Sequence, residues 1–184
     1  VGFAPVRPAD RELLIQLMEG VEDIPGPILT EGLDFRWETF PEYLDVLAER
    51  PRDMDIGALL PHAAVRVHVM GARGLALENA NADDIAAMRR IVAEAARAGA
   101  FGVSTSRTIS HKTLAGDPTP TLRAQEAELM GLARGLADGG TGFLELVSDW
   151  NTPDPATEFD MVRRVAQRTR RPVVFSLTAR HERT

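Results

Sequence analysis

The chain has 184 residues, of which 44% are hydrophobic and 26% charged, and its formal net charge is −6. These fractions are typical of a globular protein and exclude a disordered, collagenous or coiled-coil chain. The absence of cysteine excludes disulfides, thiolate metal sites and thiol nucleophiles within the chain. The acidic balance argues against a nucleic-acid partner, and no apolar run reaches the roughly 18 to 20 residues that span a bilayer. We therefore expect a cytoplasmic protein without nucleic-acid or membrane partners.

The first part of the chain, residues 1–54, is predicted to be an irregular helical region. Apolar side chains at helical spacing indicate helices over residues 11–18 and 40–47. Between these helices, Pro25 and Pro27 predict a loop, because proline disfavours both a helix interior and a strand ladder. The chain starts at Val1 rather than at a methionine, and we expect it to be part of a longer protein.

Residues 55–184 are predicted to form regular βα units. Apolar runs over 56–60, 101–106, 142–147 and 173–177 indicate strands. A helix over 82–98 is indicated between the first two strands, with Asn81 as N-cap and Gly99 as its end. Thr121 is the candidate N-cap of a second helix, and Pro155 opens a third. Strands that are apolar throughout indicate a parallel sheet covered by helices on its faces.

The predicted fold class is α/β, as a partial (β/α)8 TIM-type barrel in which parallel strands alternate with helices. A closed barrel typically takes about 250 residues. The 184 residues hold four or five βα units, which are too few to close the ring. We therefore expect a single domain over residues 1–184 that corresponds to the central part of a barrel.

Ligands of parallel α/β folds bind at the carboxyl ends of the strands, so the residues that follow each apolar run are the candidates for a site. Ser106 and Arg107 end the second run, where a guanidinium would suit a substrate carboxylate. The alternative is that Arg107 pairs with a surface acid. His111 lies on the following loop, which would form either the mouth of a barrel site or a solvated loop.

The histidines do not show the spacing of a metal pair. His62 and His68 are neither four apart, as on a helix, nor two apart, as on a strand. His62 follows the first apolar run and would either contact a ligand or be a hydrogen-bonded structural histidine. Asp149 follows the third run, where it would serve as a base or as part of an ordinary turn. Glu145 lies inside an apolar strand, so it needs a cationic neighbour or access to water.

Several segments resemble one enzyme family. They are FAP at 3–5, LMEGVEDIP at 17–25, WETFPEYL at 37–44, PHAAVR at 61–66, VMG at 69–71 and AFGVSTSRT at 100–108. In these segments the chain is similar to the N-acyl-D-amino-acid deacylases of the amidohydrolase superfamily. The resemblance covers nearly the whole chain and is most specific in the first 115 residues.

The resemblance implies a zinc-dependent amide hydrolase with a (β/α)8 barrel and an N-acyl amino acid as its small-molecule substrate. In such enzymes a metal-bound hydroxide attacks the acyl carbonyl and an aspartate moves the proton. The resemblance places most zinc ligands and the aspartate outside this chain. Many members carry histidines where this chain has Val147, Leu177 and Thr178. We therefore expect zinc in the full-length parent, an inactive isolated fragment, and no catalytic or metal-binding residue within the chain.

We expect Arg107, His111 and Ser106 to line the substrate mouth and His62 to support them. A different class of function is a non-catalytic α/β binding or structural module, whose exposed sheet edge would be covered by a partner copy in a homo-oligomer. A further alternative is another amide or imide hydrolase of the same superfamily.

Overall fold

The computed structural model describes residues 2–150 and 154–177. In chain order, its elements are η1 (Pro8–Asp10), α1 (Arg11–Glu22), α2 (Gly26–Gly32), α3 (Phe40–Glu49), β1 (Leu59–Pro61), α4 (His62–Met70), α5 (Ala72–Leu75), α6 (Ala82–Ala98), β2 (Gly102–Arg107), α7 (Glu126–Gly139), β3 (Phe143–Ser148), α8 (Pro155–Thr169) and β4 (Val173–Ser176). Among these described residues, no helix is both long and apolar enough to cross a bilayer.

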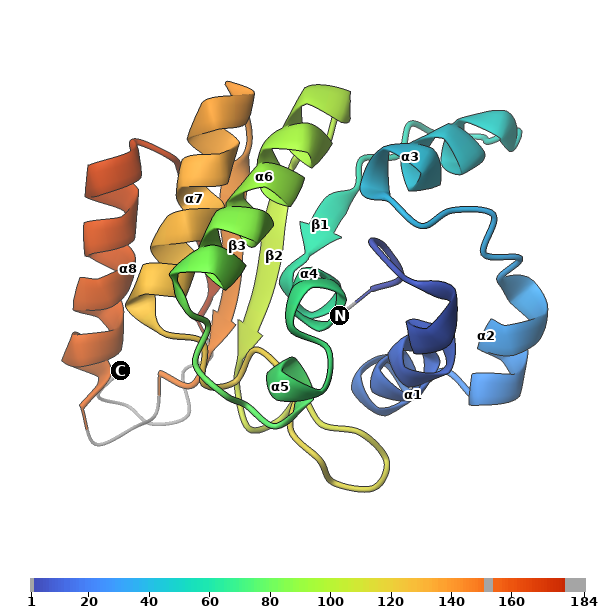
Figure 1. The fold of residues 1–184 in the computed structure, drawn as a ribbon, viewed down its shortest axis with the longest axis horizontal. Coiled ribbons are helices and arrows are strands. Elements are labelled where there is room, and N and C mark those ends of the chain that lie inside the picture. The colour runs from blue at the N-terminus through green and yellow to red at the C-terminus, as the bar shows by residue number, and fades with distance from the viewer. Residues whose placement is uncertain (1, 151–153, 178–184) are drawn as a thin grey trace.

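The described strands form one parallel sheet with the order β1-β2-β3-β4 (Figure 1). The strands are neighbours in the order in which they occur in the chain, and helices intervene between them, which is the arrangement of consecutive βα units. The α/β class is confirmed, and the open four-stranded sheet is consistent with a partial barrel.

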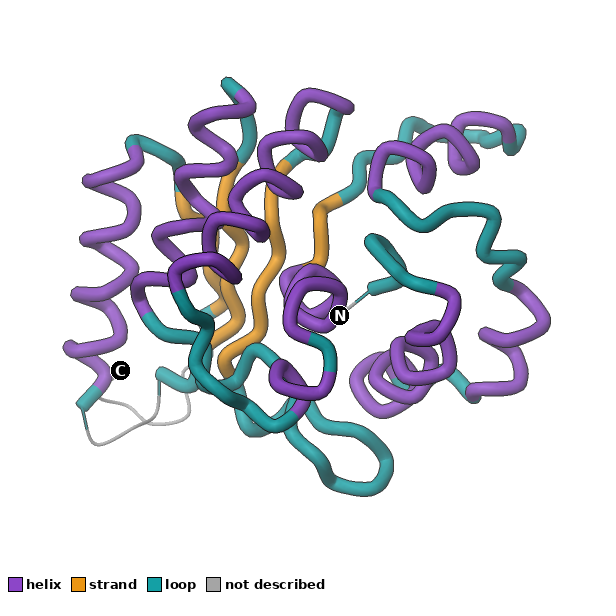
Figure 2. Tube along the Cα trace, in the orientation of Figure 1, coloured by secondary structure: helices purple, strands orange, loops and turns teal. Residues whose placement is uncertain are grey.

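Helices α6, α7 and α8 cover one face of this sheet (Figures 1 and 2). Leu144 and Leu146 of β3 are buried under them, as are Val92, Leu136 and Val165 of the three helices. Gly135 brings α7 close to α6, because a Cβ atom there would lie 2.7 Å from the carbonyl oxygen of Arg89. The covered face of the sheet therefore holds the core of this half of the molecule.

The ends of these helices follow local chemistry. Asn81 and Asp84 form a reciprocal capping box at the start of α6, and Gly99 ends it with a φ of 114°. Asp154 caps α8 by accepting a hydrogen bond from the Thr157 amide. The prediction that Thr121 caps the second helix is wrong, because α7 begins at Glu126 with Gln125 as N-cap. The Thr121 hydroxyl instead donates to the carbonyl of Ser106 (2.6 Å).

The other face of the sheet is only partly covered. The register aligns Ser104, Glu145 and Val174 in one row across β2, β3 and β4. Val174 is 51% exposed, and Glu145 is partly exposed without an ion pair among the described residues. Strands this apolar were expected to be buried on both faces. The difference arises because the described residues place no layer of helices over this face.

The first part of the chain lies beside β1 and contains more helix than the sequence predicted (Figure 1). Helices α1 and α3 match the predicted ones. The prediction of a loop around Pro25 and Pro27 is partly wrong, because α2 begins at Gly26 and includes Pro27 in its first turn. Proline is tolerated there, because the N–H groups of the first turn have no partner within the helix. Helix α4 was not predicted, and β1 lies at Leu59–Pro61 rather than at 56–60.

Candidate functional site

The carboxyl ends of the strands meet at the lower side of the view in Figures 1 and 2, where the loop between β2 and α7 also lies. Successive strand residues point to opposite faces of a sheet. Thr105 and Arg107 therefore point to the helix-covered face, and Ser106 between them points to the other. The polar run that ends β2 is divided between two environments.

On the open face, Ser106 and His111 form a hydrogen-bonded pair. Ser106 Oγ lies 2.7 Å from His111 Nδ1, and the serine is 6% exposed. Partial burial lowers the pKa of His111 below its ordinary value, so its imidazole is mostly neutral at pH 7. A neutral ring accepts from the hydroxyl when Nδ1 is unprotonated and donates to it in the other tautomer. The pair can thus adjust to either a donor or an acceptor on a ligand.

On the helix-covered face, Arg107 pairs with a carboxylate of α8. Its Nε donates to Glu158 Oε1 (2.7 Å) and its Nη2 to Oε2 (3.0 Å). The Nη1 group donates to the carbonyl of Ala124, just before α7. The bidentate geometry expected for a substrate carboxylate is present here, but Glu158 occupies it. In this chain, Arg107 ties the end of β2 to α7 and α8.

Glu158 is ionised in this setting. Burial acts to raise its pKa, but hydrogen bonds from Arg107 and Ser148 outweigh burial and hold the pKa below its ordinary value. A small cavity of about 240 Å³ is lined by both partners together with Asp149 and Asp154. Asp149 accepts hydrogen bonds from the Ile109 amide (2.8 Å) and the Thr108 hydroxyl, so it anchors the loop that follows β2.

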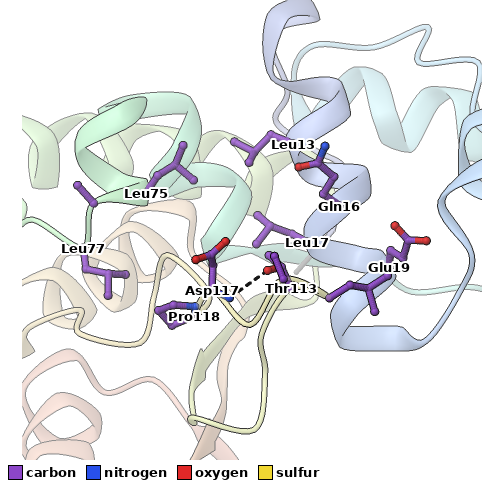
Figure 3. Close-up of a pocket in the computed structure, with 12 residues that line it drawn as sticks. Leu13, Gln16, Leu17, Glu19, Leu75, Leu77, Thr113, Asp117 and Pro118 are labelled. Atoms are coloured by element: carbon purple, nitrogen blue, oxygen red, sulfur yellow. Dashed lines mark hydrogen bonds between the residues drawn. The ribbon is translucent and has the colours of Figure 1, made fainter.

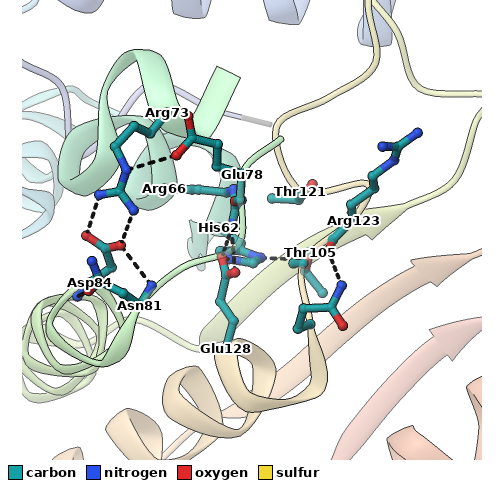
Figure 4. Close-up of polar contacts among 12 residues, drawn as sticks. His62, Arg66, Arg73, Glu78, Asn81, Asp84, Thr105, Thr121, Arg123 and Glu128 are labelled. Carbon is teal, nitrogen blue, oxygen red and sulfur yellow. Dashed lines mark hydrogen bonds and ion pairs between the residues drawn. The ribbon is translucent and has the colours of Figure 1, made fainter. Parts of the chain in front are cut away.

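His62 is fully buried at the start of α4 (Figure 4). Its Nδ1 lies 2.8 Å from Thr105 Oγ1, and its Nε2 lies 2.8 Å from Glu128 Oε1. The same carboxylate accepts from the guanidinium of Arg66, which also donates to the Glu78 carbonyl. His62 therefore joins the start of α4 to β2 and α7 and does not contact solvent.

Glu128 is the central residue of this cluster, and the sequence analysis did not identify it. Burial acts to raise its pKa, but hydrogen bonds and charge from His62 and Arg66 hold the pKa below its ordinary value. The signal in the sequence was weak. Glu128 directly precedes Leu129 of the predicted buried stripe, and an acid at that position of a helix is also common on a solvated face.

The described residues do not fit a zinc site. No group of three or more histidine, aspartate or glutamate side chains is placed to hold a metal ion within residues 2–150 and 154–177. His62 and His111 are committed to separate hydrogen-bonded clusters, and His68 lies further along α4. Thr178 and His181 lie outside the described residues.

Comparison with known proteins gives a family match. A model described as "Amidohydrolase family" matches residues 7–183. An N-acyl-D-aspartate deacylase of Alcaligenes xylosoxydans xylosoxydans is 45% identical over 84 residues, which are 45% of this chain and 16% of that protein. A D-aminoacylase of the same organism is 32% identical over 117 residues, or 63% of this chain and 22% of that protein. No solved structure gave a significant match.

Proposed function

Because the chain belongs to the amidohydrolase family, we propose that it is the central part of an enzyme that hydrolyses the amide bond of N-acyl-D-amino acids or related N-acyl compounds. Family membership indicates a hydrolase of carbon–nitrogen bonds. The named relatives support the substrate class, since both names describe action on D-amino acid derivatives. The matched segments span about a fifth of those proteins, so the activity is proposed for a longer protein.

The observation that carries the proposal within this chain is the Ser106–His111 pair at the carboxyl end of the sheet. In a barrel, this end of the strands holds the active site. Ser106 and His111 would line the substrate mouth and offer a donor or an acceptor to the polar groups of an N-acyl amino acid. The pair also fixes the start of the β2–α7 loop, so it shapes the mouth as well as lining it.

Arg107 and His62 would act differently from these two. Arg107 is engaged with Glu158 and the Ala124 carbonyl, so its contribution to the mouth would be to fix the positions of β2, α7 and α8 relative to one another. His62 is buried and would support the same end of β2 through Thr105. Zinc, where the whole enzyme uses it, would be held mostly by residues outside this chain. The isolated chain would be inactive for the same reason.

The test is hydrolysis of N-acyl-D-amino acids by the full-length enzyme with substitutions in this chain. Ser106→Ala and His111→Ala should raise KM, because both residues are proposed to contact substrate. Arg164→Ala is the matched control for Arg107→Ala, since Arg164 forms a similar bidentate pair with Glu126 that is about twice as exposed. Unchanged kcat/KM in all of the Ser106, His111 and Arg107 variants would overturn the assignment of the mouth. A panel of N-acyl amino acids and cyclic imides would separate this activity from that of other amide or imide hydrolases.

The edge strand β4 favours a second candidate, a non-catalytic module whose sheet edge is covered by another copy of the chain. Val174 and Phe175 of β4 are 51% and 37% exposed, and an edge strand that has no neighbour on its outer side among the described residues is a template for pairing. Light scattering, together with an activity assay, distinguishes the enzyme from the non-catalytic module. A defined oligomer with no amidase activity in the full-length protein would favour the module.

A further inference from the structure

A cavity of about 520 Å³ lies between α1, the turn after α5 and the loop between β2 and α7 (Figure 3). We call it the α1–α5 cavity. Its volume is in the range of small-molecule sites, which are about 300–1,000 Å³. The proposed substrate mouth does not include it, because Ser106 and His111 are not among the residues that line it.

The walls of the α1–α5 cavity are mainly apolar. Leu13 and Leu17 line it from α1, and Leu75 and Leu77 line it from the opposite side (Figure 3). Leu75 is 39% exposed, and Leu114 at the third wall is 71% exposed. These side chains would lose contact with water if an apolar ligand filled the cavity, and burial of apolar surface favours binding.

The charge of the cavity has one sign. Its carboxylates are Glu19 and Asp117, and no lysine, arginine or histidine lines it among residues 2–150 and 154–177. Glu19 is already engaged, since its Oε1 accepts from the Gly26 amide (2.8 Å). Asp117 has no hydrogen bond to its carboxylate among the described residues, and in Figure 3 this carboxylate points into the space between Leu17 and Leu77. The cavity therefore repels anions and leaves one acceptor for a cation.

The position of Asp117 is fixed before any ligand binds. The Thr113 amide donates to the Asp117 carbonyl (2.8 Å), and the Asp117 amide donates to Thr113 Oγ1 (3.1 Å). Gly20 of α1 packs against the same loop, because a Cβ atom there would lie 2.3 Å from the Lys112 carbonyl oxygen. A wall held in this way loses little conformational entropy on binding.

We propose that the α1–α5 cavity binds a hydrophobic cation, namely an aliphatic amine in its ammonium form. The alkyl chain lies against the four leucines, and the ammonium group pairs with the Asp117 carboxylate. An N-acyl amino acid does not fit this description, because its free carboxylate would face Asp117. This site is thus a further function of the chain and does not depend on the proposed hydrolase activity.

The experiment is titration of the full chain with n-octylammonium, n-octanol and octanoate. Binding is measured by calorimetry or by the NMR shifts of the cavity residues. Octylammonium should bind saturably and more tightly than octanol, and octanoate should bind least. Asp117→Asn should weaken the binding of octylammonium by about twofold to fivefold, as expected for an exposed ion pair, and leave the binding of octanol unchanged. Raising the salt concentration should reduce the difference in octylammonium affinity between the wild type and Asp117→Asn.

Matched variants separate charge from packing. Asp45→Asn removes the same charge from the exposed surface of α3 and should leave octylammonium binding unchanged. Leu75→Gln, at a partly exposed position, should weaken the binding of octylammonium and of octanol to the same extent. Equal binding of octanoate and octylammonium, or equal effects of Asp117→Asn and Asp45→Asn, would overturn the proposal. None of these readouts involves hydrolysis, so the proposed function can fail without affecting this test.

Discussion

The cluster around Glu128 and the cluster around Glu158 each pair one arginine with one carboxylate near the carboxyl ends of the strands. They differ in their access to water. Arg66 and Glu128 have side chains that are 1% exposed, whereas Arg107 and Glu158 are 16% and 17% exposed. A buried ion gains more from its partner and loses more without it, because water cannot replace the lost interaction. The comparison separates a cluster that holds the fold from one that borders the proposed mouth.

Removing the charge at the buried cluster should have the largest effect on stability. Glu128→Gln leaves the Arg66 guanidinium buried without a counterion, so we expect a loss of about 3–5 kcal/mol in the free energy of unfolding. Urea denaturation measures it. Glu126→Gln, two residues earlier on α7, is the control, because its partner Arg164 is partly exposed. A loss no larger than that of the control would contradict the burial argument.

Replacing both buried partners tests the same point from the other side. Arg66→Met combined with Glu128→Leu removes the ion pair and leaves neither the guanidinium nor the carboxylate buried without its partner. The double variant should be more stable than Glu128→Gln alone, because apolar residues of similar size often replace a buried pair at little cost. A double variant that is less stable than the single one would show that the hydrogen bonds to His62 and Glu78 dominate the cluster.

Acid should weaken the buried cluster. The pKa of Glu128 in the folded chain lies below its ordinary value of 4.5. Its contribution to stability is therefore fully present above the unfolded-state pKa and is lost as the pH falls through the folded-state pKa. The difference in unfolding free energy between the wild type and Glu128→Gln should shrink as the pH is lowered below about 4.5. A difference that stays constant down to pH ~3 would contradict this linkage.

The hydrogen bond between His62 and Thr105 should contribute less than the charges beside it. Thr105→Val keeps the shape of the side chain and removes the partner of the imidazole Nδ1. The cost should be about 1–3 kcal/mol, the penalty for leaving a buried polar atom unpaired. Thermal unfolding measures it. Thr157→Val, at an exposed position of α8, is the control, since within the described residues its hydroxyl bonds to the cap residue Asp154 alone.

The regular half of the fold was predictable from the sequence for a physical reason. Helix α6 has a cap at each end and an apolar stripe on one face, so its bounds follow from local chemistry. Helix α4 was missed because His62 to Val67 are all buried, which leaves no contrast between an apolar and a polar face. Its valines also favour a strand. A helix enclosed by the rest of the molecule carries no amphipathic signal.

The candidate site was predictable only as a set of positions. The rule that ligands bind at the carboxyl ends of strands selected Ser106, Arg107 and His111. It could not show that Arg107 and Ser106 point to opposite faces with different partners. The pairing of Arg107 with Glu158 joins residues 51 apart in the chain, and that of His62 with Glu128 joins residues 66 apart. Such pairs depend on tertiary packing, which periodicity and spacing do not encode.

The partly exposed cluster should give a smaller change in stability than the buried one. Arg107→Ala removes the bidentate pair with Glu158 and the bond to the Ala124 carbonyl. Because water reaches these groups, we expect a loss of about 1–2 kcal/mol in the free energy of unfolding. Arg107→Lys should recover only part of it, since an ammonium group cannot form the planar bidentate contact. A loss equal to that of Glu128→Gln would remove the distinction between the two clusters.

Of the ion pairs compared, the surface pair between Arg164 and Glu126 should contribute least to stability. It has the same bidentate geometry as Arg107 and Glu158, but its side chains are 38% and 33% exposed. Solvent screening and the entropy of two ordered side chains should make its contribution to stability smaller than that of Arg107 with Glu158. A double-mutant cycle with Arg164→Ala and Glu126→Ala measures the coupling, and salt should reduce it further. A coupling as large as that of Arg107 with Glu158 would mean that exposure does not govern these pairs, and the ordering of all the preceding variants would lose its physical basis.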